Sequence, residues 1–319
     1  MRSFGSDNNS GVHPSIMDAI AKANFHHALA YGDDDWTARA IQKIKETFGH
    51  TAEVCFVFNG TGANVIALRA CCQPFHAIIA AKSAHIAVDE CGAPSFLTGA
   101  AIKEVETSDG KLTPDLIRPL LHGWGFEHHS QPKVVYISQC TELGTIYTIE
   151  EIKQLADYIH QYDMYLHVDG ARIANAAVSL EKSFKEITVD CGVDILSFGG
   201  TKNGCMLAES VITFKPELVT NLKYIRKQST QLYSKMRYVS AQITTYLDHE
   251  LWRQNAKQAN EMAQLLRSGI EELGKFTFTQ PTEANIILVK MDPDITEKLL
   301  RKHFFYIWDE NSHEIRLVT

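Results

Sequence analysis

The sequence predicts an α/β protein in which a mostly parallel sheet is flanked by helices and joined to a smaller C-terminal α+β domain. Short apolar runs alternate with amphipathic stretches along most of the 319 residues, which is typical of βα units. From about residue 245 the pattern changes to a long polar helix followed by short strands. Because single cores stop growing near about 250–300 residues, we expect a large domain at 14–245 and a small domain at 246–319, with residues 1–13 packing nearby.

The expected strands of the large domain are short apolar runs bounded by turn residues. They lie at 53–58, 76–81, 134–138, 164–168, 193–197 and 207–213. A helix is expected at 148–161, because apolar side chains recur there at helical spacing and Thr148 and Glu151 form a capping-box pair. In the small domain we expect helices at 249–273 and 295–303 and strands at 276–280, 285–290, 304–308 and 314–318.

Composition and charge exclude several classes of protein. The formal net charge of −7 argues against general binding to nucleic acids or anionic membranes. The N-terminus has no signal pattern, and no apolar run reaches the roughly 18 residues of a membrane span, so we expect a cytoplasmic protein. The seven cysteines form no Cys-x-x-Cys pair, which favours buried reduced thiols over a zinc ribbon or a disulfide framework.

An aspartate and a lysine form the first candidate catalytic pair. Asp169 ends one apolar run, and Lys202 lies in the glycine-rich segment 197–204 that ends the next. An aspartate placed in this way can keep a pyridine nitrogen protonated, and a lysine whose pKa is lowered by burial or by positive charge can form a Schiff base. The pair predicts pyridoxal phosphate as the cofactor and carbanion chemistry on amino acids.

The phosphate of such a cofactor needs a site of its own, and residues 59–64 supply a candidate. Gly60, Thr61 and Gly62 follow an apolar run and precede a run expected to be helical. Glycines let the backbone approach an anion, and a helix N-terminus attracts it. Thr201, next to the lysine, can add a hydroxyl group.

His85 is a further candidate, in a loop after the strand-like run at 76–81. A histidine there can stack on the cofactor ring and relay protons, because its unperturbed pKa of about 6.5 lets it accept or donate a proton near neutrality. The alternative is a histidine on a surface loop, and the residue alone does not separate the two interpretations.

Short motifs spread over almost the whole chain carry a resemblance to a known family. They are Ser6-Asp7-Asn8, Tyr31-Gly32, Asn59 to Asn64, His85, Val168 to Arg172, Ser197 to Gly204 and Glu314 to Thr319. In order, they resemble the motifs of L-threonine aldolases in the aromatic amino acid β-eliminating lyase superfamily. The segments 89–94 and 197–204 most resemble the low-specificity threonine aldolase, or phenylserine aldolase, branch.

This resemblance implies a fold and an activity. The fold is the aspartate aminotransferase-like one, fold type I of the pyridoxal-phosphate enzymes. The activity is aldol cleavage of L-threonine and related β-hydroxy-α-amino acids, such as allo-threonine and phenylserine, to glycine and an aldehyde. The alternative within the superfamily is a β-eliminating lyase that acts on an aromatic amino acid.

The resemblance also implies roles by position. Lys202 is the residue that would carry the cofactor, Asp169 would pair with its pyridinium, and His85 would stack on its ring. Arg172 would lie beside the ring hydroxyl or the substrate carboxylate. The turn at 59–64 would hold the phosphate.

The remaining implied roles concern the substrate and a second subunit. Ser6 and Arg316 match family positions that bind the substrate carboxylate, where a planar guanidinium can hold two oxygens at once. Arg237 matches a basic residue near the phosphate that reaches in from a partner subunit, so a homodimer or homotetramer is implied. Relatives of this kind continue into a final helix beyond the position of Thr319.

One position departs from the family pattern. Many threonine aldolases carry a histidine, in a Glu-Asn-Thr-His type string, where this chain has Gln139-Cys140-Thr141-Glu142. An ionised carboxylate can accept the proton of the β-hydroxyl group, which makes Glu142 a catalytic candidate, alone or through a water that it holds together with His85. The alternative is that Glu142 only braces its loop.

Two other classes of protein, an iron-dependent enzyme and a non-catalytic scaffold, fit the sequence less well. His167 and Asp169 have the spacing of the first half of a two-histidine, one-carboxylate iron site, but such sites usually lie in β-sandwich scaffolds. A non-catalytic scaffold would not need the lysine. The adjacent His128 and His129 have no acidic or cysteine partner at metal-binding spacing, so we interpret them as solvated loop residues and predict no metal.

Overall fold

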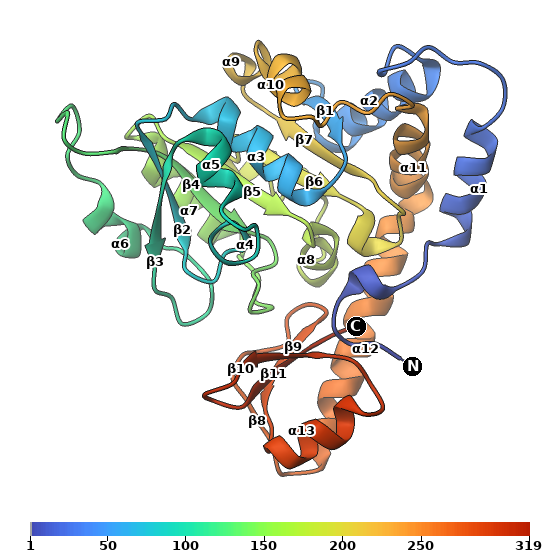
Figure 1. The fold of residues 1–319 in the computed structure, drawn as a ribbon, viewed down its shortest axis with the longest axis vertical. Coiled ribbons are helices and arrows are strands. Elements are labelled where there is room, and N and C mark those ends of the chain that lie inside the picture. The colour runs from blue at the N-terminus through green and yellow to red at the C-terminus, as the bar shows by residue number, and fades with distance from the viewer. Residues whose placement is uncertain (1) are drawn as a thin grey trace.

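The computed structural model describes residues 2–319, and the larger part of the chain is built on a seven-stranded sheet (Figure 1). The strand order is β1-β7-β6-β5-β4-β2-β3, and neighbours are parallel except for β7, which runs antiparallel to β1 and β6. The predicted mostly parallel α/β sheet is confirmed. The strands are β1 (Glu53–Val57), β2 (His76–Ala81), β3 (Ala101–Val105), β4 (Gln131–Ser138), β5 (Tyr165–Gly170), β6 (Ile195–Gly199) and β7 (Glu209–Thr213).

The apolar pattern did not predict β3. This strand forms an edge of the sheet, where it pairs with β2. Ala101 and Glu104 are exposed and Lys103 is half-buried, so the strand has no continuous apolar run. Charged side chains are common on edge strands because they oppose pairing with another chain.

Helices of the larger part pack against this sheet. α3 contacts β4, β5, β6 and β7 and is covered in turn by α5 and α10, which explains why its segment 62–68 is buried. The capping box predicted for α7 is present, between Thr148 and Glu151. None of the helices within residues 2–319 is long and apolar enough to cross a membrane. The helices are α1 (Pro14–Ala23), α2 (Asp35–Phe48), α3 (Gly60–Cys71), α4 (His85–Val88), α5 (Ala93–Thr98), α6 (Pro114–Ile117), α7 (Ile149–His160), α8 (Ile173–Ser179), α9 (Pro216–Val219), α10 (Leu222–Gln228) and α11 (Arg237–Leu247).

The C-terminal part forms a second, antiparallel sheet of four strands in the order β10-β11-β9-β8, here called the small sheet. The long helix α12 runs down to it from the seven-stranded sheet (Figure 1). The strand expected at 276–280 has only two residues, because Pro281 cannot donate to a strand partner and the chain leaves the sheet before it. The elements are α12 (Leu251–Glu272), β8 (Thr277–Phe278), β9 (Ile286–Lys290), α13 (Pro293–Leu300), β10 (Tyr306–Asp309) and β11 (Glu314–Val318).

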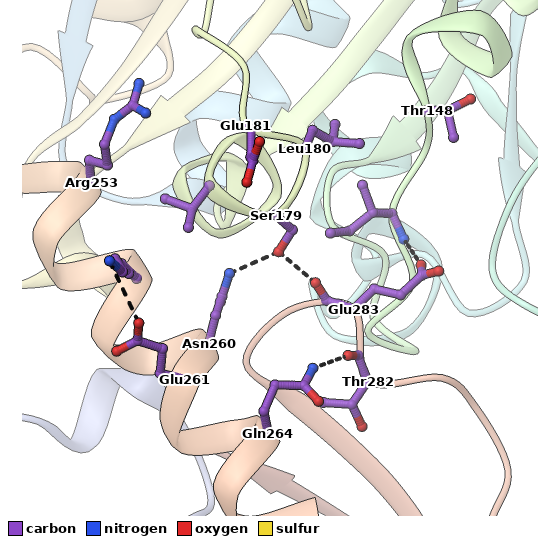
Figure 2. Close-up of a pocket in the computed structure, with 13 residues that line it drawn as sticks. Thr148, Ser179, Leu180, Glu181, Arg253, Asn260, Glu261, Gln264, Thr282 and Glu283 are labelled. Carbon is purple, nitrogen blue, oxygen red and sulfur yellow. Dashed lines mark hydrogen bonds and ion pairs between the residues drawn. The ribbon is translucent and has the colours of Figure 1, made fainter.

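A cleft of about 960 Å³ lies where α8, α12 and the loop before β9 meet (Figure 2). Asn260 of α12 donates a hydrogen bond to the Ser179 hydroxyl (2.9 Å), and Ser179 donates to the carbonyl oxygen of Glu283 (2.6 Å). Gln264 donates to the carbonyl oxygen of Thr282 (2.5 Å). These bonds tie the small sheet to the larger part of the chain.

The N-terminal segment lies against the small sheet and close to the C-terminal end of the chain (Figure 1). Phe4 donates its N–H to the carbonyl oxygen of Phe304 (2.6 Å) and accepts from the N–H of Val318 (2.8 Å). The following short helix at Asp7–Asn9 contacts the turn that carries Lys202.

Candidate active site

Parallel strands end at the same edge of the large sheet, and most predicted site residues meet there. They line one cavity of about 240 Å³. The predicted residues on its wall are Gly60, Thr61, His85, Glu142, Asp169, Arg172, Thr201 and Lys202. Residues to which no individual role was assigned from the sequence also line it, among them Asn8, Asn64, Ser138, Cys140 and Glu209.

Asp169, at the end of β5, is held by hydrogen bonds on both oxygens. Its Oδ2 accepts from the Tyr136 hydroxyl (2.6 Å) and from Asn64 Nδ2 (3.0 Å), and its Oδ1 accepts from the N–H of Ala171 (2.9 Å). Burial would raise the pKa of this carboxyl, but the hydrogen bonds from Tyr136 and Asn64, with the charge of Lys202, hold the pKa below its ordinary value. An ionised Asp169 can keep a proton on a ring nitrogen placed against it.

Lys202 lies in a 3-10 turn (Thr201–Asn203) between β6 and β7. The turn is anchored by Asn203, which donates to the Tyr246 hydroxyl (2.9 Å). Burial and the nearby charge of Arg172 lower the pKa of Lys202 below its ordinary value. A lysine in this state is a better nucleophile near neutral pH than a solvated one.

The turn before α3 is open on one side and closed on the other. Asn59 caps the helix by accepting from the N–H of Gly62 (2.7 Å), so the N–H groups of Gly60 and Thr61 have no partner inside the helix. A Cβ at Gly60 would meet no atom within 4 Å, whereas a Cβ at Gly62 would overlap the side-chain amide of Gln231. The turn therefore offers a backbone site for an anion at Gly60 and Thr61.

Glu142 is hydrogen-bonded to His85, the first residue of α4. Glu142 Oε1 accepts from the backbone N–H of His85 (3.0 Å) and from the Ser138 hydroxyl (2.8 Å). Burial and the charge of Asp169 raise the pKa of Glu142. Glu142 thus holds the N-terminus of α4 through His85 and the end of β4 through Ser138, and it also lines the cavity, so its geometry is compatible with both predicted roles.

A buried ion pair between Asp7 and Arg172 forms another part of the wall. Arg172 donates from Nε to Asp7 Oδ2 (2.7 Å) and from Nη2 to Asp7 Oδ1 (3.1 Å). Burial would raise the pKa of Asp7, but the charges of Arg172 and Lys202 hold the pKa below its ordinary value. The pair commits the Nε–Nη2 side of Arg172 to Asp7 rather than to a substrate.

Arg316, on β11 of the small sheet, does not line this cavity, but its charge interacts with those of Arg172 and Glu142 on the cavity wall. Its guanidinium lies over the Trp308 ring, 4.9 Å from the centroid, and its buried Nε has no hydrogen-bond partner among the described residues. Burial and repulsion from Arg172 lower the pKa of Arg316 to about 10. Because an unpaired buried cation is costly, this arginine is suited to an anionic ligand. Ser6 lines a neighbouring cavity of about 950 Å³ that also contains Lys202.

Arg237 was predicted at the site but lies outside the cavity, whereas Glu209 was not predicted and lies on the cavity wall. Arg237 does not line the small cavity within one chain, and its Nη1 donates to the carbonyl oxygen of His26 (2.8 Å). Its place beside the phosphate would need a second subunit and stays a prediction. Glu209, which we did not predict, is buried on the cavity wall and accepts from the N–H of Thr201 (3.3 Å). It stands within an apolar strand, and nothing in the sequence marked it.

His167 is a packing residue. It is fully buried, its Nε2 lies 3.0 Å from the Ser197 hydroxyl, and burial lowers its pKa to about 4. Its ring meets that of Tyr136 edge-on, with centroids 5.0 Å apart. In the described part of the chain, no group of three His, Cys, Asp or Glu side chains is placed to hold a metal ion.

The residues at this cavity fit pyridoxal phosphate. The fit rests on three features of one cavity: Lys202, whose pKa is lowered; Asp169, whose pKa is held below its ordinary value; and the open backbone turn at Gly60 and Thr61. When bound, pyridoxal phosphate supplies an electron sink for negative charge that develops on an amino acid. Lys202 would hold it covalently, Asp169 would face its ring nitrogen, and the turn would hold its phosphate.

Comparison with known proteins agrees with this class of site. The family model described as "Beta-eliminating lyase" matches residues 3–293, so the chain belongs to the β-eliminating lyase family. The low specificity L-threonine aldolase of a Pseudomonas species is 40% identical over 300 residues, which are 94% of this chain and 87% of that protein. The enzyme of the same name from Pseudomonas aeruginosa is 40% identical over 297 residues, 93% of this chain and 86% of the relative.

Solved structures extend the likeness to the fold. A threonine aldolase of Leishmania major superposes with a TM-score of 0.95 at 30% identity, covering 100% of this chain and 94% of that one. An aspartate aminotransferase of Thermus thermophilus superposes with a TM-score of 0.69 at 15% identity, covering 97% and 84%, which is a likeness of fold alone. The predicted fold type I and pyridoxal phosphate as the cofactor are confirmed.

We expect Asp7→Asn to lower the free energy of unfolding at pH 7 by about 3–5 kcal/mol, because it leaves Arg172 buried without a counter-charge. The folded pKa of Asp7 is depressed, so its contribution is fully present above the unfolded value of about 3.9 and is lost as the pH falls through the folded pKa. Denaturant unfolding of wild type and variant from pH 7 to pH 3 should show the two converging in acid.

The matched control is Asp115→Asn, because the ion pair of Asp115 with Arg118 is exposed and should contribute about 1 kcal/mol or less. Equal stability of wild type and Asp7→Asn at pH 7 would contradict the structural role of the buried pair.

Proposed function

We propose that this protein is a pyridoxal-phosphate-dependent aldolase that cleaves L-threonine and related β-hydroxy-α-amino acids, including allo-threonine and phenylserine, to glycine and an aldehyde. The observation that carries the proposal is one cavity that joins Lys202 and Asp169 and has the unpaired Arg316 beside it. The lysine and aspartate suit the cofactor, and the arginine suits the carboxylate of an amino acid. Relatives named as low specificity L-threonine aldolases at 40% identity support this substrate class.

The proposed roles divide between binding and proton transfer. Arg316 and Ser6 bind the substrate carboxylate and so orient the Cα–Cβ bond. Asp169 keeps the proton on the ring nitrogen that it faces. His85, or a water held between His85 and Glu142, accepts the proton of the β-hydroxyl group as the bond to Cβ breaks. Lys202 lies in the same cavity as His85, Glu142 and Asp169.

A β-eliminating lyase acting on an aromatic amino acid is the second candidate, and the matched family model favours keeping it. The two reactions differ in products. Aldol cleavage gives glycine and an aldehyde, whereas β-elimination gives ammonia, a keto acid and the released aromatic group. Product analysis with threonine, allo-threonine, phenylserine and tyrosine therefore separates the two candidates.

The proposal extends to assembly and compartment. Phe25 and Leu29 are each 73% exposed in the loop whose His26 carbonyl accepts from Arg237, and contiguous exposed apolar surface often marks an interface. This supports a homodimer or homotetramer in which Arg237 contributes to a neighbouring site. The cysteines of residues 2–319 are free, which supports a reducing, cytoplasmic location.

We predict that Lys202→Ala abolishes both turnover and the absorbance of the lysine-linked cofactor while circular dichroism stays that of the wild type. The reason is that Lys202 is the only lysine among the described residues that line the cavity. Lys223→Ala, in the exposed part of α10, is the control and should keep both properties. A Lys202→Ala protein that still binds the cofactor covalently and turns over threonine would refute the proposed role.

Glu142→Gln tests the departure from the family pattern. If Glu142 takes part in proton transfer, kcat for threonine should fall by about 10²-fold or more, and the ratio of threonine to allo-threonine turnover should change. Steady-state kinetics with both substrates measures this, with Glu217→Gln on exposed α9 as the control. Unchanged rates and an unchanged ratio would leave bracing of the loop as the role of Glu142.

Subunit mixing tests whether sites are shared. Neither Lys202→Ala nor Arg237→Ala alone should be active, but mixed subunits should regain activity, because one of the two sites in a mixed pair would have both residues intact. Activity after denaturation and refolding of the mixture is the measurement. A fully active monomer at assay concentration would exclude a shared site.

A further inference from the structure

A chain of buried hydrogen bonds connects His85 to Asp169. Glu90, between α4 and α5, has its Oε1 2.8 Å from His85 Nδ1, and the same oxygen accepts from Asn64 Nδ2 (2.7 Å). Asn64 Nδ2 also donates to Asp169 Oδ2 (3.0 Å). The side chain of Glu90 has no exposed surface. None of the roles proposed above uses Glu90.

The side-chain amide of Asn64 lies between the carboxyl groups of Glu90 and Asp169. Its Nδ2 has two hydrogens, one for each of the carboxylates of Glu90 and Asp169. With the amide reversed, its oxygen would face both carboxylates, which is unfavourable. Asn64 Oδ1 and Glu90 Oε2 are buried without a partner among residues 2–319, a cost that packing alone would not require. The arrangement therefore fits two carboxylates that share one amide.

We infer that Glu90 is a positioning residue for the reaction: its carboxylate binds the Nδ1–H of His85, which leaves Nε2 as the ring nitrogen that exchanges a proton in the cavity, and Asn64 ties this pair to Asp169. The inference rests on the role proposed for His85. A carboxylate that accepts from one ring nitrogen fixes the tautomer of a histidine and stabilises the imidazolium that forms when the other nitrogen takes a proton.

The charged groups around His85 agree with this role. The hydrogen bond that His85 donates to Glu90 raises the pKa of His85, and burial opposes this. The charge of Asp169 raises the same pKa, and the charge of Lys202 lowers it. The hydrogen bond between Glu142 and His85 involves the backbone N–H of His85 and not its imidazole ring. Glu90 is therefore the group that contacts the imidazole directly, and its loss should act on the ring rather than on the loop.

The test is Glu90→Gln, which keeps the shape of the side chain and removes its charge. Histidine labelled at Cε1 gives one resonance per ring, and comparison with His85→Asn identifies that of His85. In the holoenzyme without substrate, we expect the His85 pKa in Glu90→Gln to fall by about 1–3 units. The acid limb of the kcat/KM profile should move in the same direction. Glu127→Gln is the matched control, because Glu127 lies 3.9 Å from His128 on the exposed surface.

Two results would overturn the inference. One is a folded Glu90→Gln holoenzyme in which the His85 pKa and the pH profile stay at the wild-type values. The other comes from the wild type and needs no variant: nitrogen-15 shifts that show Nδ1 of His85 without a proton. Both magnetic resonance measurements are made without substrate. They can therefore contradict the role of Glu90 while the protein still cleaves threonine, and they can support that role even if threonine is not a substrate.

Discussion

The ionised carboxylate of Asp169 is the constraint on which the rest of the site depends. A charge buried at the end of a central strand is tolerated only when hydrogen bonds replace the lost water. The donors come from three elements: Tyr136 from β4, Asn64 from α3 and the backbone after β5. α3 must therefore lie across these strands with a polar side chain on its buried face. Once α3 is placed in this way, its N-terminus points at the cavity and supplies the free N–H groups of the phosphate turn.

The two arginines of the site differ in their counter-charges, because Arg172 is paired with a carboxylate and, in the described part of the chain, Arg316 is not. Arg172 is neutralised by Asp7, so it lowers the pKa of Lys202 less than an unpaired arginine would. Among residues 2–319 the buried Nε of Arg316 has no partner, and the turn at Gly60 and Thr61 has N–H groups without an acceptor in its helix. In the proposed function, the substrate carboxylate would bind at Arg316 and the cofactor phosphate at the turn, so each place would receive one anion. Binding of these two anions would therefore relieve the unfavourable burial of unpaired positive charge and of unpaired N–H groups.

Sequence patterns predicted those parts of the fold and site that depend on local order along the chain. The order of βα units, the capping box of α7, and the positions of Asp169 and Lys202 at strand ends all follow from short-range patterns. Glu209 lies only eight positions from its partner Thr201, but their contact depends on how β7 folds back beside β6. Asn64 could not be assigned an individual role from the sequence, because its partners Glu90, Tyr136 and Asp169 lie 26 to 105 positions away. The same holds for the pairing of Asp7 with Arg172. The edge strand β3 was missed because solvent-facing charges interrupt its apolar pattern.

The contacts between the two sheets explain why the proposed carboxylate site is separate from the proposed cofactor site. Arg316 is on the small sheet, whereas Lys202 and Asp169 follow strands of the large one. Asp7 stands between them, bound to Arg172 on one side and to Asn285, just before β9, on the other (3.3 Å). In addition, Asn255 of α12 donates to the carbonyl oxygen of Asn203 in the lysine turn (2.9 Å). If the proposed roles hold, a substrate bound to the cofactor at one end and to Arg316 at the other must span both sheets. Part of its binding energy therefore goes into fixing their relative position, and a ligand without a carboxylate would lose orientation at Cα as well as affinity.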